Sequence, residues 1–117
     1  MKENIEFRSL CPVATSLDII GDKWTLLILR DMIWGHKTMF HEFKESPEKM
    51  PSKMLSNRLK KLESIGFISK QKGTVNKKSI YYLLEKRGFD TFPIMIEMAI
   101  FTTKHFFDHL GTTYTGD

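Results

Sequence analysis

PSKMLSNRLKKLESIG, residues 51–66, is the stretch that decides the fold of this 117-residue chain. The helix that it predicts begins at Pro51 or Ser52 and ends at Ile65, because Gly66 is a strong stop signal. Three leucines spaced at i, i+4 and i+7 share one side of this helix: Leu55, Leu59 and Leu62. A leucine stripe of this kind anchors a helix in a core and leaves its other side free.

The other side of the predicted helix carries small polar and basic groups. The residues that fall there are Lys53, Asn57, Lys60 and Ser64. A helix with one apolar and one polar or basic face fits the major groove of B-DNA, where side chains reach base edges. An ordinary amphipathic surface helix has the same pattern and is commoner, so the neighbouring segments decide between the two interpretations.

Two predicted strands follow the helix, residues 67–72 and 78–84, with turn-forming residues 73–77 between them. They form a β-hairpin whose basic residues are Lys70, Lys72, Lys77 and Lys78. Residues 49–87 hold eleven Lys and Arg against two acidic residues, a net charge of +9, whereas the rest of the chain holds seven basic and twelve acidic residues. Such segregation is typical of a protein that binds a polyanion, although a lysine-rich solvated surface has the same charge.

Helical patterns also occur before and after this region. Three precede it, at residues 12–20, 23–34 and 38–46, the last with Thr38 as its cap and with Phe40 and Phe43 directed inward. One follows it, from Asp90 or Pro93 to about Leu110. The order of elements predicts a mostly α fold with a small β-hairpin (α+β), a winged helix-turn-helix with flanking N- and C-terminal helices. We expect one domain over residues 1–117, with its core at about 11–106.

Composition excludes several classes of protein. A single cysteine cannot form an internal disulfide, which favours the reducing cytoplasm. The first ten residues include Glu3 and Glu6 and no continuous apolar run, so we do not expect a signal peptide. The longest apolar runs, such as Leu26–Leu29, are far too short to span a membrane.

The last predicted helix is apolar on two faces. One face carries Met95, Ala99, Phe106 and Leu110, and the other carries Ile94, Met98 and Phe101. A chain of this size has too small a core to cover both, so we expect a second subunit to cover one of them. The residues expected at this homodimer interface are Met95, Ala99, Phe101 and Phe106. A single wide core face is the alternative.

Cys11 directly precedes Pro12, at the expected N-cap of the first helix. The positive end of the helix dipole favours a thiolate there, which is the chemistry of a redox or electrophile sensor. A small residue with a purely structural role is the other interpretation.

Catalytic and metal-binding patterns are weak. Residues 41–45 begin like a zinc-protease HExxH motif, but they end in Glu45 in place of histidine. His105 and His109 are four residues apart, yet only Asp108 is near enough in sequence to add a third ligand. No phosphate-binding loop occurs, and no nucleophile has an evident base. We therefore expect no enzyme activity, cofactor or metal.

The chain resembles the HxlR-type regulators, bacterial and archaeal relatives of the MarR-type winged-helix proteins. The segments that carry the resemblance span residues 11–106: Cys11–Val13, Leu17–Gly21, Lys23–Arg30, Phe40–Phe43, Leu55–Glu63, Gly66–Ile68, Tyr81–Leu83 and Phe92–Met95. This resemblance implies a DNA-binding homodimer built from the first and last helices. It also implies that Cys11 occupies the position of a cysteine that some members use for sensing.

The predicted function is sequence-specific binding of double-stranded DNA by a homodimer that represses or activates transcription. The residues near the N-terminal end of the helix, where base edges are read, are Ser52, Lys53, Ser56 and Asn57. Lys60 is expected to meet phosphate, and Lys77 and Lys78 to meet backbone or the adjacent minor groove. Two-fold symmetry predicts a pseudo-palindromic operator with half-sites ~34 Å apart. A winged-helix domain used for protein–protein contact is the alternative.

Overall fold

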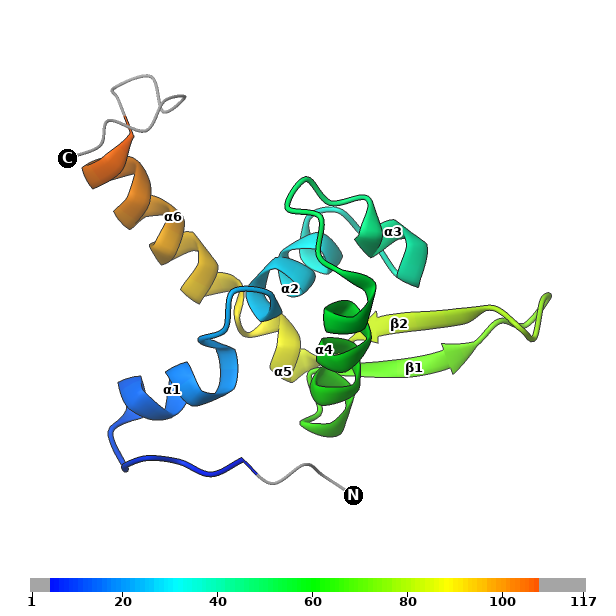
Figure 1. The fold of residues 1–117 in the computed structure, drawn as a ribbon, viewed down its shortest axis with the longest axis horizontal. Helices are drawn as coiled ribbons and strands as arrows, with labels where there is room; N and C mark the ends of the chain where they lie inside the picture. The colour runs from blue at the N-terminus through cyan, green and yellow to red at the C-terminus, as the bar shows by residue number, and fades with distance from the viewer. Residues whose placement is uncertain (1–4, 108–117) are drawn as a thin grey trace.

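The structure, a computed structural model, describes residues 5–107. Within this range the elements follow in the order α1 (Pro12–Ile20), α2 (Thr25–Ile33), α3 (Phe40–Lys44), α4 (Ser52–Ser64), β1 (Ile68–Lys72), β2 (Ile80–Leu84), α5 (Lys86–Phe89) and α6 (Phe92–Phe106). Helices α2, α3 and α4 lie at the centre, the hairpin projects from them, and α1 and α6 extend from the opposite side (Figure 1). This arrangement confirms the predicted winged helix-turn-helix with flanking helices.

The core lies where α2, α3, α4 and the base of the hairpin meet. The predicted leucine stripe of α4 is fully inside it, with Leu55 and Leu62 at 0% and Leu59 at 2% exposure. The buried residues that surround this stripe are Ile28, Leu29, Met32, Phe43, Met50, Phe67 and Ile68. Burial of one complete face of α4 explains why a helix of mostly polar composition is stable there.

Helix ends follow the expected signals in most places. Helix α1 has the predicted bounds, with Cys11 as its N-cap and Pro12 in its first turn. Helix α4 ends just before Gly66, whose φ of 81° lies in the left-handed region that favours glycine. The Gly66 amide donates a hydrogen bond to the Glu63 carbonyl, which satisfies one of the last acceptors of the helix.

Helix α3 corrects two expectations. Its N-terminus is held by the Glu42 carboxylate, which accepts the amides of Thr38 at 2.8 Å and Met39 at 3.0 Å, and not by the Thr38 hydroxyl. A carboxylate in the first turn can reach back in this way and also suits the positive helix end. Phe43 is buried as predicted, but Phe40, the first residue of α3, is 36% exposed and does not point into the core.

The hairpin is a two-stranded antiparallel sheet whose register runs from Ile68↔Leu84 to Lys72↔Ile80. The strands begin and end within two residues of the predicted ones. The Tyr82 amide donates to the Thr38 carbonyl at 2.8 Å, so the segment before α3 is attached to the hairpin. The Tyr82 ring also meets Phe43 edge to face. These contacts hold the wing against the three-helix core.

The short helix α5 was not predicted. It carries Gly88, which is buried and packs so closely that a Cβ there would lie 2.4 Å from the Phe67 carbonyl oxygen. Helix α6 starts at Phe92, whose ring packs against Trp34 and stacks on Phe89. Leu110, where the last helix was expected to end, lies outside the described residues. Over residues 5–107, no helix is long and apolar enough to cross a membrane.

Candidate nucleic-acid interface

The face of α4 opposite its leucines is open to solvent. Every residue proposed for DNA contact on this helix is exposed: Ser52, Lys53, Ser56, Asn57 and Lys60. Ser64, expected on the same face, is half-buried, and its hydroxyl donates to the Lys61 carbonyl at 2.8 Å. The usable polar face therefore covers the first nine residues of α4, near the end that enters the major groove in helix-turn-helix docking.

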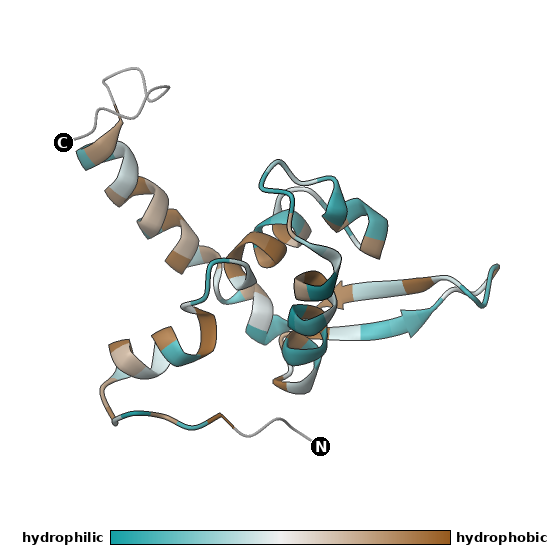
Figure 2. Cartoon of the chain, in the orientation of Figure 1, coloured by the Kyte–Doolittle hydropathy of each residue, from teal (hydrophilic) through white to brown (hydrophobic). Residues whose placement is uncertain are grey.

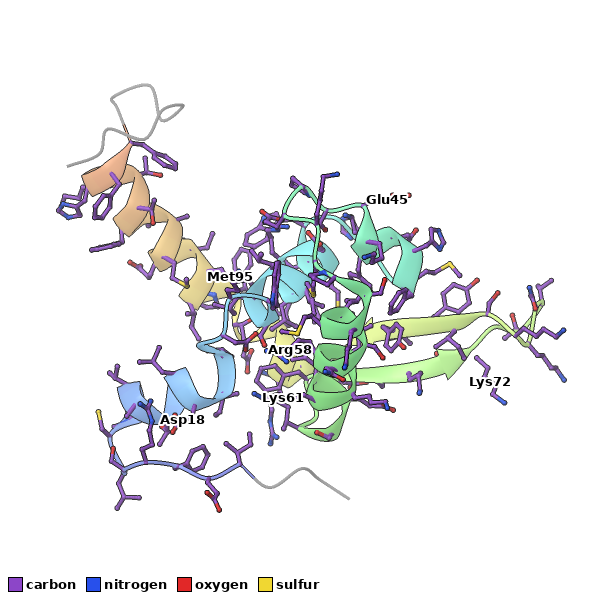
Figure 3. The ribbon with its side chains drawn as sticks, in the orientation of Figure 1. Asp18, Glu45, Arg58, Lys61, Lys72 and Met95 are labelled. Carbon is purple, nitrogen blue, oxygen red and sulfur yellow. The ribbon has the colours of Figure 1, made fainter. Side chains whose placement is uncertain are left out.

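The wing presents exposed lysines along its strands and at its tip. Lys70 and Lys72 lie on β1, and Lys77 and Lys78 lie in the turn. All four side chains are exposed to solvent. Figure 3 shows the Lys72 side chain leaving the hairpin toward solvent. These ammonium groups form a second basic surface beside α4, which is suited to phosphate contact.

The turn at the wing tip has a defined conformation. The Lys78 amide donates to Asn76 Oδ1 at 3.0 Å, and the Ser79 amide donates to the Asn76 carbonyl at 3.0 Å. The Gly73 amide closes the turn by donating to the Ser79 carbonyl at 2.9 Å. An Asn side chain that bonds the backbone two residues on is a common turn device. It fixes the backbone from which Lys77 and Lys78 project.

The basic block of residues 49–87 divides into two groups. Four of its cations have hydrogen-bond or ion-pair partners in the protein: Arg58 with Asp22, Lys61 with the Ile19 carbonyl, Lys86 with Asp90 and Arg87 with the Ile65 carbonyl. The other seven have no side-chain hydrogen bond or ion pair with residues 5–107: Lys49, Lys53, Lys60, Lys70, Lys72, Lys77 and Lys78. Six of these seven are residues that sequence analysis placed on the candidate surface or in the wing.

Asp22, in the turn between α1 and α2, contacts both α2 and α4, which sequence analysis did not predict. Its Oδ2 accepts the amides of Trp24 and Thr25, each at 3.1 Å, and Arg58 Nε at 2.8 Å. Its Oδ1 accepts the Thr25 hydroxyl at 2.5 Å. Burial opposes ionisation of Asp22, but the hydrogen bonds from Thr25, Arg58 and Trp24 outweigh it and lower its pKa to about 2.

A second polar cluster fixes the segment that leads into α4. Arg30 makes a two-pronged contact with Glu48, with both N–O distances at 2.8 Å, and this contact lowers the pKa of Glu48 to about 2. The buried Asp31 carboxylate accepts the Ser46 hydroxyl. Lys37 Nζ lies 3.2 Å from the same hydroxyl. The connection between α3 and α4 is thereby attached to α2.

The sequence profile of the HxlR-like helix-turn-helix family matches residues 19–109. The chain belongs to this family. YdeP of Bacillus subtilis, described as an HTH-type transcriptional regulator, is 34% identical over 95 residues, which cover 81% of this chain and 73% of YdeP. The family and this relative are transcription regulators and not enzymes.

Solved structures of redox-linked regulators share the fold. The redox regulator HypR in its oxidized form is 29% identical, with a TM-score of 0.70, and the match covers 81% of this chain and 97% of HypR. YodB of Bacillus subtilis in a quinone-bound form is 25% identical, with a TM-score of 0.64, and the match covers 80% of this chain and 99% of YodB. This HxlR-like chain therefore has the architecture of these regulators over most of its length.

Cys11 of this HxlR-like chain is exposed, at the N-cap position that sequence analysis expected. Its carbonyl accepts the Thr15 amide at 2.9 Å, and its own amide lies 3.2 Å from Ser9 Oγ. The preceding segment is held on α1 by Arg8, whose Nε lies 2.7 Å from Asp18 Oδ1. The thiol is thus accessible at the start of a helix whose backbone is ordered by its neighbours.

Helix α6 leaves most of its apolar side chains uncovered. Phe101 is 59% and Phe106 38% exposed, and Ala99 is exposed as well, whereas Met95 is half-buried against the core of its own chain. Hydrophobic residues line both α1 and α6 (Figure 2). A groove of about 620 Å³ lies between α1, α2 and α6, and its walls include Leu17, Leu26, Leu27, Ile94 and Met98.

The histidine pattern at residues 105–109 lies only partly within the described residues. Among residues 5–107, no three His, Cys, Asp or Glu side chains gather at one point that could hold a metal ion. Asp108 and His109, the other possible ligands beside His105, are outside this range.

Proposed function

We propose that this HxlR-family chain is a cytoplasmic homodimer that binds double-stranded DNA at a specific operator and so regulates transcription as a repressor or activator. One observation carries the proposal. The exposed side of α4 gathers Ser52, Lys53, Ser56, Asn57 and Lys60, while its opposite side is buried and the lysine-bearing wing lies beside it. Major-groove reading requires this combination of a firmly anchored helix with a short polar face.

The two surfaces perform different tasks in this account. On α4, the Asn57 amide pairs bidentately with adenine and Lys53 reaches guanine, so these side chains supply sequence preference. Lys60 meets phosphate. Lys77 and Lys78 at the wing tip contact the backbone or the adjacent minor groove, and they supply affinity without sequence preference.

The dimer is supported by the uncovered apolar surface of α1 and α6. Phe101 and Phe106 lie on the outer half of α6, where the described residues of the chain leave them exposed. A two-fold dimer that buries this surface would present two copies of α4. Two half-sites about one helical turn apart, or ~34 Å, then make a pseudo-palindromic operator.

The proposal also includes redox or electrophile control of DNA binding through Cys11. Its support is an exposed thiol at a helix N-cap, together with the relationship to HypR, a redox regulator, and to YodB, which binds quinone. Oxidation or alkylation of Cys11 would alter the start of α1, which borders the proposed dimer surface. A small oxidant or electrophile is thus the proposed effector.

Selection of bound duplexes from a random DNA pool tests the proposal. We expect an enriched pseudo-palindromic sequence whose binding weakens steeply with salt, because lysine–phosphate contacts release counterions. A chain that enriches no sequence and instead binds a protein partner independently of salt would support the alternative of a winged-helix domain for protein–protein contact.

A further inference from the structure

Two cations of α4 point away from the proposed DNA surface and toward α1 and α2. Arg58 Nε lies 2.8 Å from Asp22 Oδ2, and Lys61 Nζ lies 3.3 Å from the Ile19 carbonyl oxygen. Figure 3 shows both side chains on the side of α4 that faces α1. The last turn of α1, through the Ile19 carbonyl, and the turn before α2, through Asp22, are thus attached to α4 at two positions that lie three residues apart.

The Arg58 contact is well sheltered and specific. The side chains of Arg58 and Asp22 are only 22% and 24% exposed. The Asp22 carboxylate is itself held by the Trp24 and Thr25 amides at the start of α2, so it cannot follow a displaced Arg58 without breaking that cap. Arg58 is therefore joined to a fixed point of the three-helix core.

The position of Arg58 along the helix gives this contact a functional consequence. Arg58 directly follows Asn57, which is exposed, and directly precedes Leu59, which is 2% exposed. A stripe of leucines holds a helix against a core but permits small rotations about the helix axis, because apolar contacts are not directional. A directional charged hydrogen bond on the flank restricts such rotation.

The geometry points to Arg58 as a positioning residue for DNA reading: through Asp22 it sets the rotation of α4 so that Asn57 and Lys53 face base edges. This inference rests on the proposed DNA-reading function of α4. Arg58 itself does not contact DNA. Arg58, the residue that follows Asn57 in sequence, therefore acts on the choice of operator, and not on general attraction to phosphate.

The test compares Arg58→Gln, Arg58→Lys and Asp22→Asn with a matched control, Lys60→Gln, which removes an exposed cation on the same helix. Each full-length variant is first checked for wild-type circular dichroism. Its affinity is then measured against salt on the selected operator and on an unrelated duplex. Separately, the carboxyl group of Asp22 is titrated by NMR in the DNA-free wild type and in Arg58→Gln.

We expect Arg58→Gln and Asp22→Asn each to weaken operator binding by roughly tenfold, with unchanged affinity and salt slope on the unrelated duplex. The Asp22 result is the more diagnostic, because removal of an acid near a polyanion would otherwise strengthen binding. Arg58→Lys, which keeps the charge, should recover part of the preference. Lys60→Gln should lower the salt slope on both duplexes by about 0.9. In free Arg58→Gln, the pKa of Asp22 should rise.

Each of the following results would overturn the inference. A lower salt slope for Arg58→Gln on both duplexes would show that Arg58 contacts phosphate. The affinity for the operator, divided by the affinity for the unrelated duplex, could be the same in Asp22→Asn as in the wild type, or the pKa of Asp22 could be unchanged in Arg58→Gln. Either result would show that the Arg58–Asp22 pair does not position α4. If wild type discriminates no duplex at all, the DNA-reading function fails and the positioning role fails with it. If the wild type prefers the operator and Arg58→Gln keeps the full preference, the positioning role is refuted and the DNA-reading function stands.

Discussion

Arg58 and Asp22 are 36 residues apart in sequence, yet Arg58 Nε and Asp22 Oδ2 lie 2.8 Å apart. The same carboxylate caps the start of α2 through the Thr25 amide and hydroxyl. One acidic side chain thus joins the first helix of the core to the helix proposed to read DNA. Its removal affects both a helix cap and a charged hydrogen bond, each of which contributes measurably to stability.

The first prediction concerns stability against pH. The pKa of Asp22 is about 2 in the folded protein, against an ordinary value of 3.8. A carboxyl group whose pKa is lowered by folding stabilises the protein above its unfolded pKa, and this contribution is lost as pH falls toward the folded pKa. Asp22→Asn should therefore lower the free energy of unfolding by about 2 kcal/mol at neutral pH, and the deficit should shrink between about pH 4 and pH 2.

Urea unfolding of both proteins across this pH range provides the measurement. Asp90→Asn is the control, because it removes a carboxylate from an exposed pair with Lys86 and should change stability by less than about 0.5 kcal/mol. A deficit for Asp22→Asn that stays constant from neutral pH to about pH 2 would contradict the assigned role of the carboxylate.

The second prediction concerns assembly. Phe101→Asp should weaken self-association, because an unpaired charge in an apolar contact is costly. Lys104→Asp also adds an acid to exposed α6 but removes no apolar surface, and it should have a smaller effect. Light scattering at micromolar concentration distinguishes the species. A folded wild-type protein that is monomeric under these conditions would rule out the homodimer.

The third prediction concerns the wing. Lys77→Ala and Lys78→Ala should weaken binding to operator and unrelated DNA alike. Each substitution that removes one phosphate contact should lower the slope of log affinity against log salt concentration by roughly 0.9. The physical reason is that an exposed lysine on a loop neutralises phosphate without reading a base. Lys104→Ala, an exposed lysine on α6, should leave the slope unchanged. Equal slopes in wild type and both wing variants would exclude the wing from DNA contact.

The fourth prediction concerns Cys11. Its thiol should react with iodoacetamide faster than free cysteine at neutral pH, because it is exposed at a helix N-cap, a setting in which reactive cysteines occur. Alkylation should change DNA affinity in wild type and have no effect in Cys11→Ser. If the wild type reacts no faster than free cysteine, or binds DNA equally well after alkylation, Cys11 is not a sensor.

Local patterns in the sequence predicted the parts of the fold that depend on local geometry. The spacing of Leu55, Leu59 and Leu62 identified the buried face of α4, and Gly66 identified its end. The exposed residues proposed for DNA contact follow from the same periodicity, since the opposite face of a helix is set once one face is buried.

The contacts that sequence analysis missed depend on tertiary structure. The Asp22–Arg58 pair joins residues that periodicity cannot relate, although Asp22 ahead of Thr25 is a recognisable start signal for a helix. Charge counting assigned Arg58 and Lys61 to a DNA-binding block, because it cannot tell a cation that faces the core from one that faces solvent. Thr38 was favoured as a cap by residue type, but the longer Glu42 side chain reaches the same amides.

In the proposed mode of binding, α4 reads bases and the wing does not. The most direct test is random-pool DNA selection with wild type, Asn57→Ala and Lys77→Ala in parallel. We expect the wild type to select a pseudo-palindromic sequence. Asn57→Ala should lose the preference at one position of each half-site, at a cost of about 1–3 kcal/mol, and Lys77→Ala should select the same sequence as the wild type. A preference that Asn57→Ala leaves intact and Lys77→Ala changes would contradict this mode of binding.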